Sequence, residues 1–220
     1  MKIISKLLLS FILIAAVSPV RAEGLQDSVD QAAIILKRFK EMPEQSIPEK
    51  VLRDARGLAI LTVVKAGFVV SARGGQGIVV ARISTNEWSG PSAIATGGAG
   101  LGFQIGAQAS EFVLVLNTPE AVKAFSRGGN VSLGTDLSVA AGPVGRDLGV
   151  DVAPTAAIYT YSKSQGLFAG LSLEGTVIIT RNEHNTKYYG KRVEVEDIFK
   201  GKIPPPAGAQ ALIRELKALP

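Results

Sequence analysis

Glycine recurs inside apolar sequence between residues 97 and 106, in the run GGAGLGFQIG. A glycine-rich loop could cradle phosphate groups, because backbone N–H groups can then approach an anion closely. The spacing does not fit, since Gly100-Leu101-Gly102 is followed by three residues before Gly106, where the dinucleotide fingerprint has two. The run instead predicts strand sequence in which glycine permits a sharp bend or close packing of a neighbouring strand.

His184 is the only histidine, and it lies in the polar stretch Asn182-Glu183-His184-Asn185, which predicts an exposed loop. One imidazole in a chain without cysteine makes no histidine-based zinc site unless carboxylates are added. No Gly-x-Ser-x-Gly elbow is present for a serine nucleophile. We therefore predict no catalytic residue, no metal site and no cofactor, and we expect a protein that is not an enzyme.

Carboxylates could still form an acid–base pair. Those in apolar or glycine-rich surroundings, where shifted pKa values are most expected, are Glu111, Asp136, Asp147, Asp151 and Glu174. Their scattered positions favour ordinary caps and turn residues. A carboxylate-based hydrolase is therefore the weaker alternative.

Basic residues accompany an amphipathic segment near the N-terminus. Residues 25–41 predict a helix with an apolar stripe of Leu25, Val29, Ala32, Leu36 and Phe39, which Ile35 extends. Ile34 falls on the polar side. Basic residues beside such a helix suit an anionic lipid surface, although Asp27, Asp30 and Glu41 weaken the attraction. Our candidate lipid-binding residues are Lys37, Arg38, Lys40, Arg53, Arg56, Leu36 and Phe39. The alternative is a helix that simply packs on the sheet.

The first 22 residues have the three parts of a secretory signal peptide: a basic start, an apolar run over 7–17, and a cleavage site after Ala22. An uncleaved anchor is the alternative, but the run is short for a bilayer. Cleavage would leave 21 basic residues against 19 acidic ones, which gives little support to nucleic-acid binding. Without cysteine there is no disulfide and no lipid-modified thiol. We expect export, to a bacterial periplasm, with peripheral membrane association.

The remaining pattern predicts one α+β domain over 23–220. A short helix over 47–56 follows the capping-box sequence Ser46-Ile47-Pro48-Glu49, and further helices are expected from Thr118 to Gly128 and over 207–218. Short antiparallel strands are predicted over 58–64, 67–72, 77–82, 93–96, 101–109, 112–116, 131–142, 155–162, 166–173 and 175–181. The expected core is a glycine-rich antiparallel sheet or barrel, with amphipathic helices at the N- and C-terminal ends.

Several motifs, in order along the chain, resemble the SYLF domain family. They are ARGLAI at 55–60, KAGF at 65–68, RGGQG at 73–77, WSGPSAI at 88–94, LGTD at 133–136, GPVGR at 142–146, YSKSQGLFAG at 161–170, SLEG at 172–175 and Asn185 with Tyr188-Tyr189-Gly190. The resemblance covers roughly residues 30–217.

In that family the domain is a lipid-binding module; eukaryotic members bind phosphoinositides, and some fungal members also bind actin. The resemblance therefore implies an anionic phospholipid partner, contacted by the N-terminal helix and its basic neighbours. Export would make actin an unexpected partner here. A scaffold that binds another envelope protein, without lipid specificity, is the alternative function.

Overall fold

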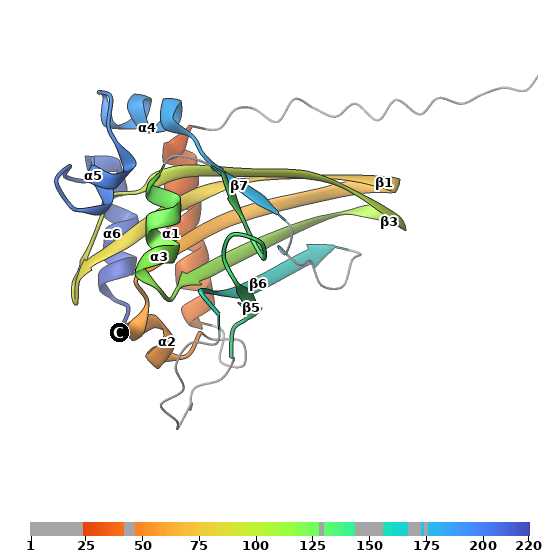
Figure 1. Cartoon of the computed structure of the whole chain (residues 1–220), viewed down its shortest axis with the longest axis horizontal. Helices are drawn as coiled ribbons and strands as arrows, with labels where there is room; N and C mark the ends of the chain where they lie inside the picture. The colour runs from red at the N-terminus through yellow and green to blue at the C-terminus, as the bar shows by residue number, and fades with distance from the viewer. Residues whose placement is uncertain (1–23, 42–46, 128–129, 144–155, 167–172, 174–175) are drawn as a thin grey trace, which may run out of the picture.

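The computed structural model describes residues 24–41, 47–127, 130–143, 156–166, 173 and 176–220 (Figure 1). The helices are α1 (Leu25–Glu41), α2 (Glu49–Asp54), α3 (Pro119–Ser126), α4 (Asn182–Tyr189), α5 (Val195–Phe199) and α6 (Gln210–Lys217), with a 3₁₀ turn η1 (Ala207–Ala209). The strands are β1 (Gly57–Ser84), β2 (Glu87–Trp88), β3 (Ser92–Leu116), β4 (Asn130–Ser132), β5 (Val139–Ala141), β6 (Ile158–Gly166) and β7 (Val177–Thr180). The predicted α+β class with helices at both ends is confirmed.

Two long strands dominate the sheet. β1 and β3 form one antiparallel ladder from Gly57–Leu116 to Val79–Ser92, with one irregularity between Gly67 and Val69. The strand order is β2-β1-β3-β6-β5, and β7 joins both β3 and β4. The prediction of separate short strands over 58–82 and 93–116 is therefore wrong. The glycines that looked like breaks keep extended backbone, so the ladder continues through them.

β1 folds back so that its two halves meet. A Cβ placed on Gly75 would lie 2.6 Å from the carbonyl oxygen of Thr62, and one on Gly77 would lie 2.6 Å from the Cα of Leu61. The N–H of Arg82 donates to the carbonyl of Arg56 at 2.9 Å, which closes the start of the strand against its end. Gly75 and Gly77 thus serve the close packing that the sequence analysis predicts for the run over 97–106.

Of the glycines in the dense run 97–106, the structure describes the surroundings of Gly97 and Gly98, and neither lies tightly against backbone. On Gly97 a Cβ would have only the carbonyl oxygen of Arg73 near it, at 3.9 Å. On Gly98 it would meet the flexible side chain of Arg73, with Nε at 2.9 Å. Both glycines are exposed. The tight glycine contacts in the described part of the sheet are those of β1.

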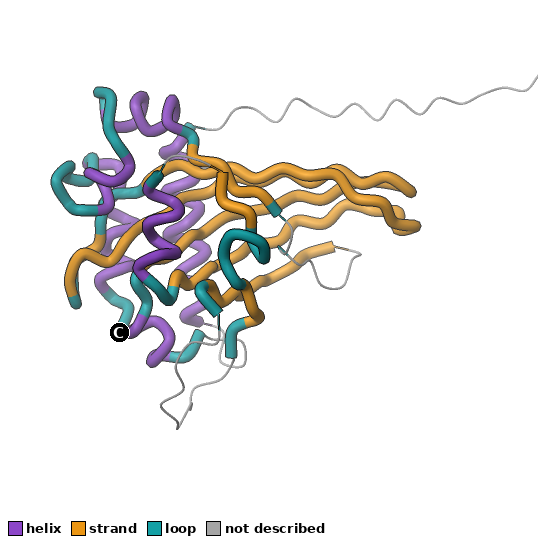
Figure 2. The backbone as a smooth tube through the Cα atoms, in the orientation of Figure 1, coloured by secondary structure: helices purple, strands orange, loops and turns teal. Residues whose placement is uncertain are grey.

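Side chains alternate between two cores on the two faces of the sheet. Leu58 and Ile60 enter the first core, which is closed by α1, α2 and α6, whereas Ala59 and Leu61 enter the second core with α3 and α5. Burial of both faces explains the nearly continuous apolar sequence of this half of β1. Figures 1 and 2 show the helices gathered at one end of the sheet, while β1 and β3 extend beyond them.

Several local predictions need correction. The helix predicted from residue 47 begins at Glu49, because Pro48 is extended (ψ 140°); Ser46 lies outside the described residues. The strand predicted over 131–142 is two short strands, β4 and β5, separated by a turn, and β5 pairs with β6 in parallel. The strand predicted over 166–173 falls mostly outside the described residues. The final helix is confirmed, with Leu212, Ile213 and Leu216 buried.

Replacing Gly75 by alanine should destabilise the fold by about 1–3 kcal/mol, because the new methyl group must displace backbone at the fold-back. The adjacent Gly74 is the matched control, since a Cβ there meets nothing within 4 Å. Gly74→Ala should change stability by less than about 1 kcal/mol. Urea unfolding measures both variants, and equal effects would contradict the close contact.

Candidate functional site

Helix α1 carries most of the predicted lipid-binding residues, and its apolar stripe is packed on the sheet. Leu36 and Phe39 are only 2% and 3% exposed, in the first core with Leu58, Ile60 and Leu212. The other residues of the stripe, Leu25, Val29 and Ile35, are buried with them. The apolar stripe of α1 therefore packs on the sheet, which is the alternative that the sequence left open. Ile34 lies on the solvent side, as its position in the pattern predicts.

Arg38 and Lys40 form ion pairs with two different neighbours of α1. Arg38 Nη1 donates to Glu111 Oε1 on β3, and the Glu111 side chain is only 15% exposed. This hydrogen bond, reinforced by the carboxylate charge, raises the pKa of Arg38 and keeps the guanidinium charged. Lys40 Nζ lies 3.3 Å from Glu215 Oε2 on α6. The two cations therefore do not converge on one surface.

The remaining predicted cations are exposed. Lys37 makes no ion pair within the described part of the chain. Arg53, on α2, has only a 4.0 Å approach to Glu49. Arg56 is exposed at the start of the sheet. It lies near Arg82, whose pKa is lowered first by the burial of its own guanidinium and then by the positive charge of Arg56. Of the five predicted cations, three are therefore available at the surface.

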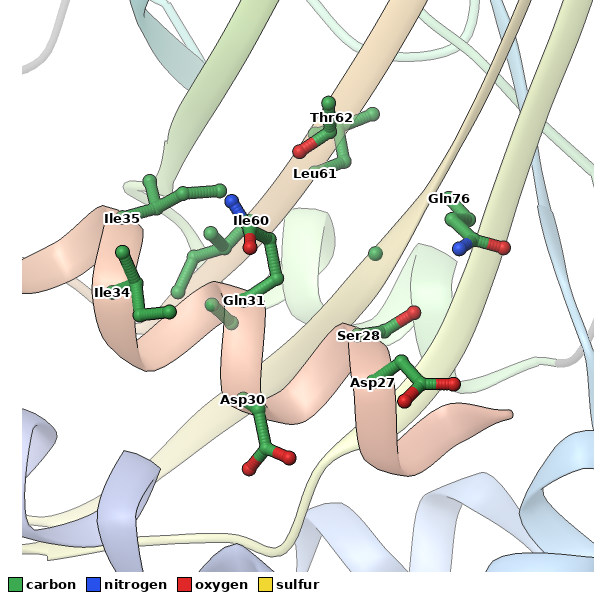
Figure 3. Close-up of a pocket in the computed structure, with 12 residues that line it drawn as sticks. Asp27, Ser28, Asp30, Gln31, Ile34, Ile35, Ile60, Leu61, Thr62 and Gln76 are labelled. Atoms are coloured by element: carbon green, nitrogen blue, oxygen red, sulfur yellow. The ribbon is translucent and has the colours of Figure 1, made fainter. Parts of the chain in front are cut away.

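A groove of about 420 Å³ runs between α1 and β1. Figure 3 shows α1 side chains along one wall and Ile60, Leu61, Thr62 and Gln76 across from them. Its two carboxylates do not converge: Asp27 Oδ2 accepts from the N–H of Gly24, and Asp30 Oδ1 accepts from Gln26 Nε2. Asp30 points away from β1 in Figure 3. The groove therefore holds no acid–base pair.

A second groove, of about 480 Å³, lies where α1 meets α2 and residues 218–220. Leu36 and Phe39 line it together with Ile47 and Leu52, and Lys40 and Glu49 supply its charged groups. The structure thus brings Leu36, Phe39 and Lys40 of the predicted set to one place, beside the helix that carries Arg53.

The other candidates for chemistry have structural roles where the structure describes them. Glu111 pairs with Arg38 in the middle of a strand, so its assignment as a cap or turn residue is wrong. Asp136 is a turn residue, as predicted, and accepts from the N–H of Ser132 at 2.8 Å. Asp147, Asp151 and Glu174 lie outside the described residues.

His184 belongs to α4, so the predicted exposed loop is also wrong. Partial burial and the charge of Arg181 lower its pKa. Among the residues that the structure describes, no three potential metal ligands lie together. In the same ranges, no helix is long and apolar enough to cross a membrane.

Sequence reasoning missed one ion pair and one exposed side chain on this side of the molecule. It named Glu111 as a candidate carboxylate but not as the partner of Arg38. Glu111 lies 73 residues from Arg38, and no local pattern announces the pair. Val64 ends the strand predicted over 58–64, and the pattern of that strand does not show that Val64 is 50% exposed.

A double-mutant cycle should separate the two ion pairs of α1. Coupling between Arg38→Met and Glu111→Gln should be about 1 kcal/mol or more, because the Glu111 carboxylate is largely shielded from water. Coupling between Lys40→Met and Glu215→Gln should be about 0.5 kcal/mol or less, since the Glu215 side chain is 29% exposed where that of Glu111 is 15% exposed. Urea unfolding of the wild type and the six variants measures both cycles, and equal couplings would contradict the difference in burial between Glu111 and Glu215.

Comparison with known proteins places this fold. Residues 97–219 match the family Ysc84, described as "Las17-binding protein actin regulator". "SH3 domain-containing YSC84-like protein 1" of Homo sapiens is 50% identical over 196 residues, which are 86% of this chain and 57% of that protein. "LAS seventeen-binding protein 3" of Saccharomyces cerevisiae is 44% identical over 204 residues, 89% of this chain and 44% of that protein. The chain thus spans less than three fifths of the length of these relatives. It belongs to the Ysc84 family, in agreement with its resemblance to SYLF domains.

Proposed function

We propose that the chain is a non-enzymatic module that docks on anionic phospholipid. The supporting observation is the set of exposed cations Lys37, Arg53 and Arg56, which lie on α1, on α2 and just before β1. Each Lys or Arg near an anionic surface contributes about 1 kcal/mol of attraction. Export through a cleaved leader over 1–22 would place this docking at a bacterial envelope membrane, as a peripheral association.

The other predicted residues have defined places in this proposal. Arg38 and Lys40 add positive charge at the C-terminal end of α1, although each already faces a carboxylate. Leu36 and Phe39 line the second groove, between α1 and α2. Direct contact of these two side chains with a bilayer would require the elements around them to move, because both are buried.

Reversing the exposed cations should abolish selective docking. The variant Lys37→Glu/Arg53→Glu/Arg56→Glu should lose at least about tenfold in partition to phosphatidylserine-containing vesicles at low salt, because three attractive charges become repulsive. Co-sedimentation with vesicles of phosphatidylcholine, with and without phosphatidylserine, measures the effect. Added salt should narrow the difference between wild type and variant.

The matched control is Lys123→Glu/Arg127→Glu/Lys191→Glu, which makes the same change in net charge at exposed positions on or after α3 and after α4. It should retain most of the binding. Equal losses in the two triple variants would mean that only net charge matters. No partition of the wild type to anionic vesicles, or equal partition to neutral ones, would overturn the proposed function.

A protein-binding scaffold is the second candidate, and the family's description as a Las17-binding actin regulator favours it. The partner would then bind without lipid, as an envelope protein if the chain is exported. An exported chain would not meet actin in the cell, so nothing would maintain an actin-binding surface on it. We therefore expect residues 23–220 not to co-sediment with actin filaments. Co-sedimentation in the absence of vesicles would favour this candidate and count against the exported role.

A further inference from the structure

Large apolar side chains are exposed at two places in the described part of the chain. Ile34 on α1 and Val64 on β1 are each 50% exposed, and Val177 and Ile179 on β7 are 37% and 38% exposed. Single exposed apolar residues need no explanation, but neighbouring ones mark a contact surface. The first question is whether Ile34 and Val64 are neighbours.

The ion pair of α1 places them on the same side of the sheet. Arg38 lies one helical turn after Ile34, on the same side of α1, and its guanidinium pairs with Glu111 on β3. Glu111 lies directly across the ladder from Thr62, and Val64 is two residues further along the same face. Ile34 therefore lies on the side of α1 that borders the uncovered continuation of the sheet.

Small side chains extend this surface. Val64 pairs with Ala109, and Ala66 pairs with Ala107; all three alanines are exposed and face the same way as Val64. We call Ile34, Val64, Ala66, Ala107 and Ala109 the Ile34–Val64 face. It is smooth and apolar, and it begins where α1 stops covering the sheet.

The border of this face is mainly basic. Lys37 lies one turn after Ile34, and Lys163 on β6 is directly across the ladder from Glu111. Arg38 offsets the charge of Glu111 through their ion pair. Asp30 lies one turn before Ile34, at the end of the face towards the N-terminus of α1. Near the sheet, Lys37 and Lys163 therefore border the apolar residues, and the carboxylate of Glu111 there is already offset by Arg38.

We propose that the Ile34–Val64 face is the part of the molecule that enters the interfacial layer of an anionic bilayer, while α1 stays packed on the sheet. The inference rests on the proposed function and adds an apolar contact beside Lys37, the cation that belongs to both. An apolar patch with a cationic border matches the two attractions that hold a peripheral protein on anionic lipid. The buried stripe of α1 then remains in the core, and docking needs no release of the helix.

Polar replacement of the two large side chains tests the assignment. Ile34→Gln/Val64→Thr keeps a good helix former and a good strand former at the two sites. We expect about tenfold weaker partition to phosphatidylcholine–phosphatidylserine vesicles, because several methylene groups lose their burial in lipid. The matched control, Val177→Thr/Ile179→Thr, should bind within about twofold of wild type at the same lipid concentration. Thermal unfolding checks that both variants remain folded.

A tryptophan reporter gives an independent measurement. The native Trp88 is 4% exposed and is the only tryptophan of the chain, so its emission should not respond to vesicles. On addition of vesicles, the new tryptophan of Ile34→Trp should shift its emission to the blue, and this variant should bind more tightly than wild type. Ile179→Trp should show neither change. A blue shift and tighter binding are gains that an unfolded variant would not show, so this measurement does not depend on a loss of binding.

The outcomes separate the inference from the function beneath it. Wild-type binding that is unchanged in Ile34→Gln/Val64→Thr, or lost in the β7 control instead, overturns the inference and leaves the proposed function standing. Absence of wild-type binding overturns both. A change in oligomeric state with unchanged lipid binding, measured by sedimentation velocity, would assign the face to a second copy of the chain and also overturn the inference.

Discussion

The fold-back of β1 is the contact on which the rest of the structure depends. It requires backbone to pass close to backbone at Gly75 and Gly77, where any side chain would separate the two halves of the strand. Because β3 follows β1 along the whole ladder, the same bend is imposed on both strands. The bend brings alternating residues of both halves of β1 to the same two cores, and this fixes where helices can pack.

The sequence was informative about elements whose signal is local. The 3.6-residue period of α1 predicted its bounds, and the hydroxyl of Thr118 caps α3 by accepting from the N–H of Ala121. The continuity of β1 and β3 could not be predicted in the same way. In a sequence, glycine suggests the end of a strand. Only the pairing with the neighbouring strand shows that the backbone stays extended through it.

The candidate site was predictable in residue type but not in arrangement. The sequence named the basic residues, yet periodicity does not show that Arg38 forms an ion pair with Glu111 or that Lys40 forms one with Glu215. Some motif residues have structural roles instead. Buried Asn185 accepts from the N–H of Ala93 and donates to Ser92, and Tyr189 donates to the carbonyl of Pro91, so two separated motifs stabilise each other.

The position of α1 in the chain has a consequence for synthesis. The stripe of α1 emerges first, but its partners include β1, β3 and α6, the last of which ends at Lys217. The β1–β3 ladder can grow from the turn that joins its nearest residues, near Val79 and Ser92, towards its distant ends. Helix α1 packs into the first core, which contains Leu58 and Val115 from the distant ends as well as Val80 from near the turn, so its docking needs the whole ladder and belongs to the late stage of folding. Until then the apolar stripe of α1 lacks its native cover, and the nascent chain can associate with other apolar surfaces through it.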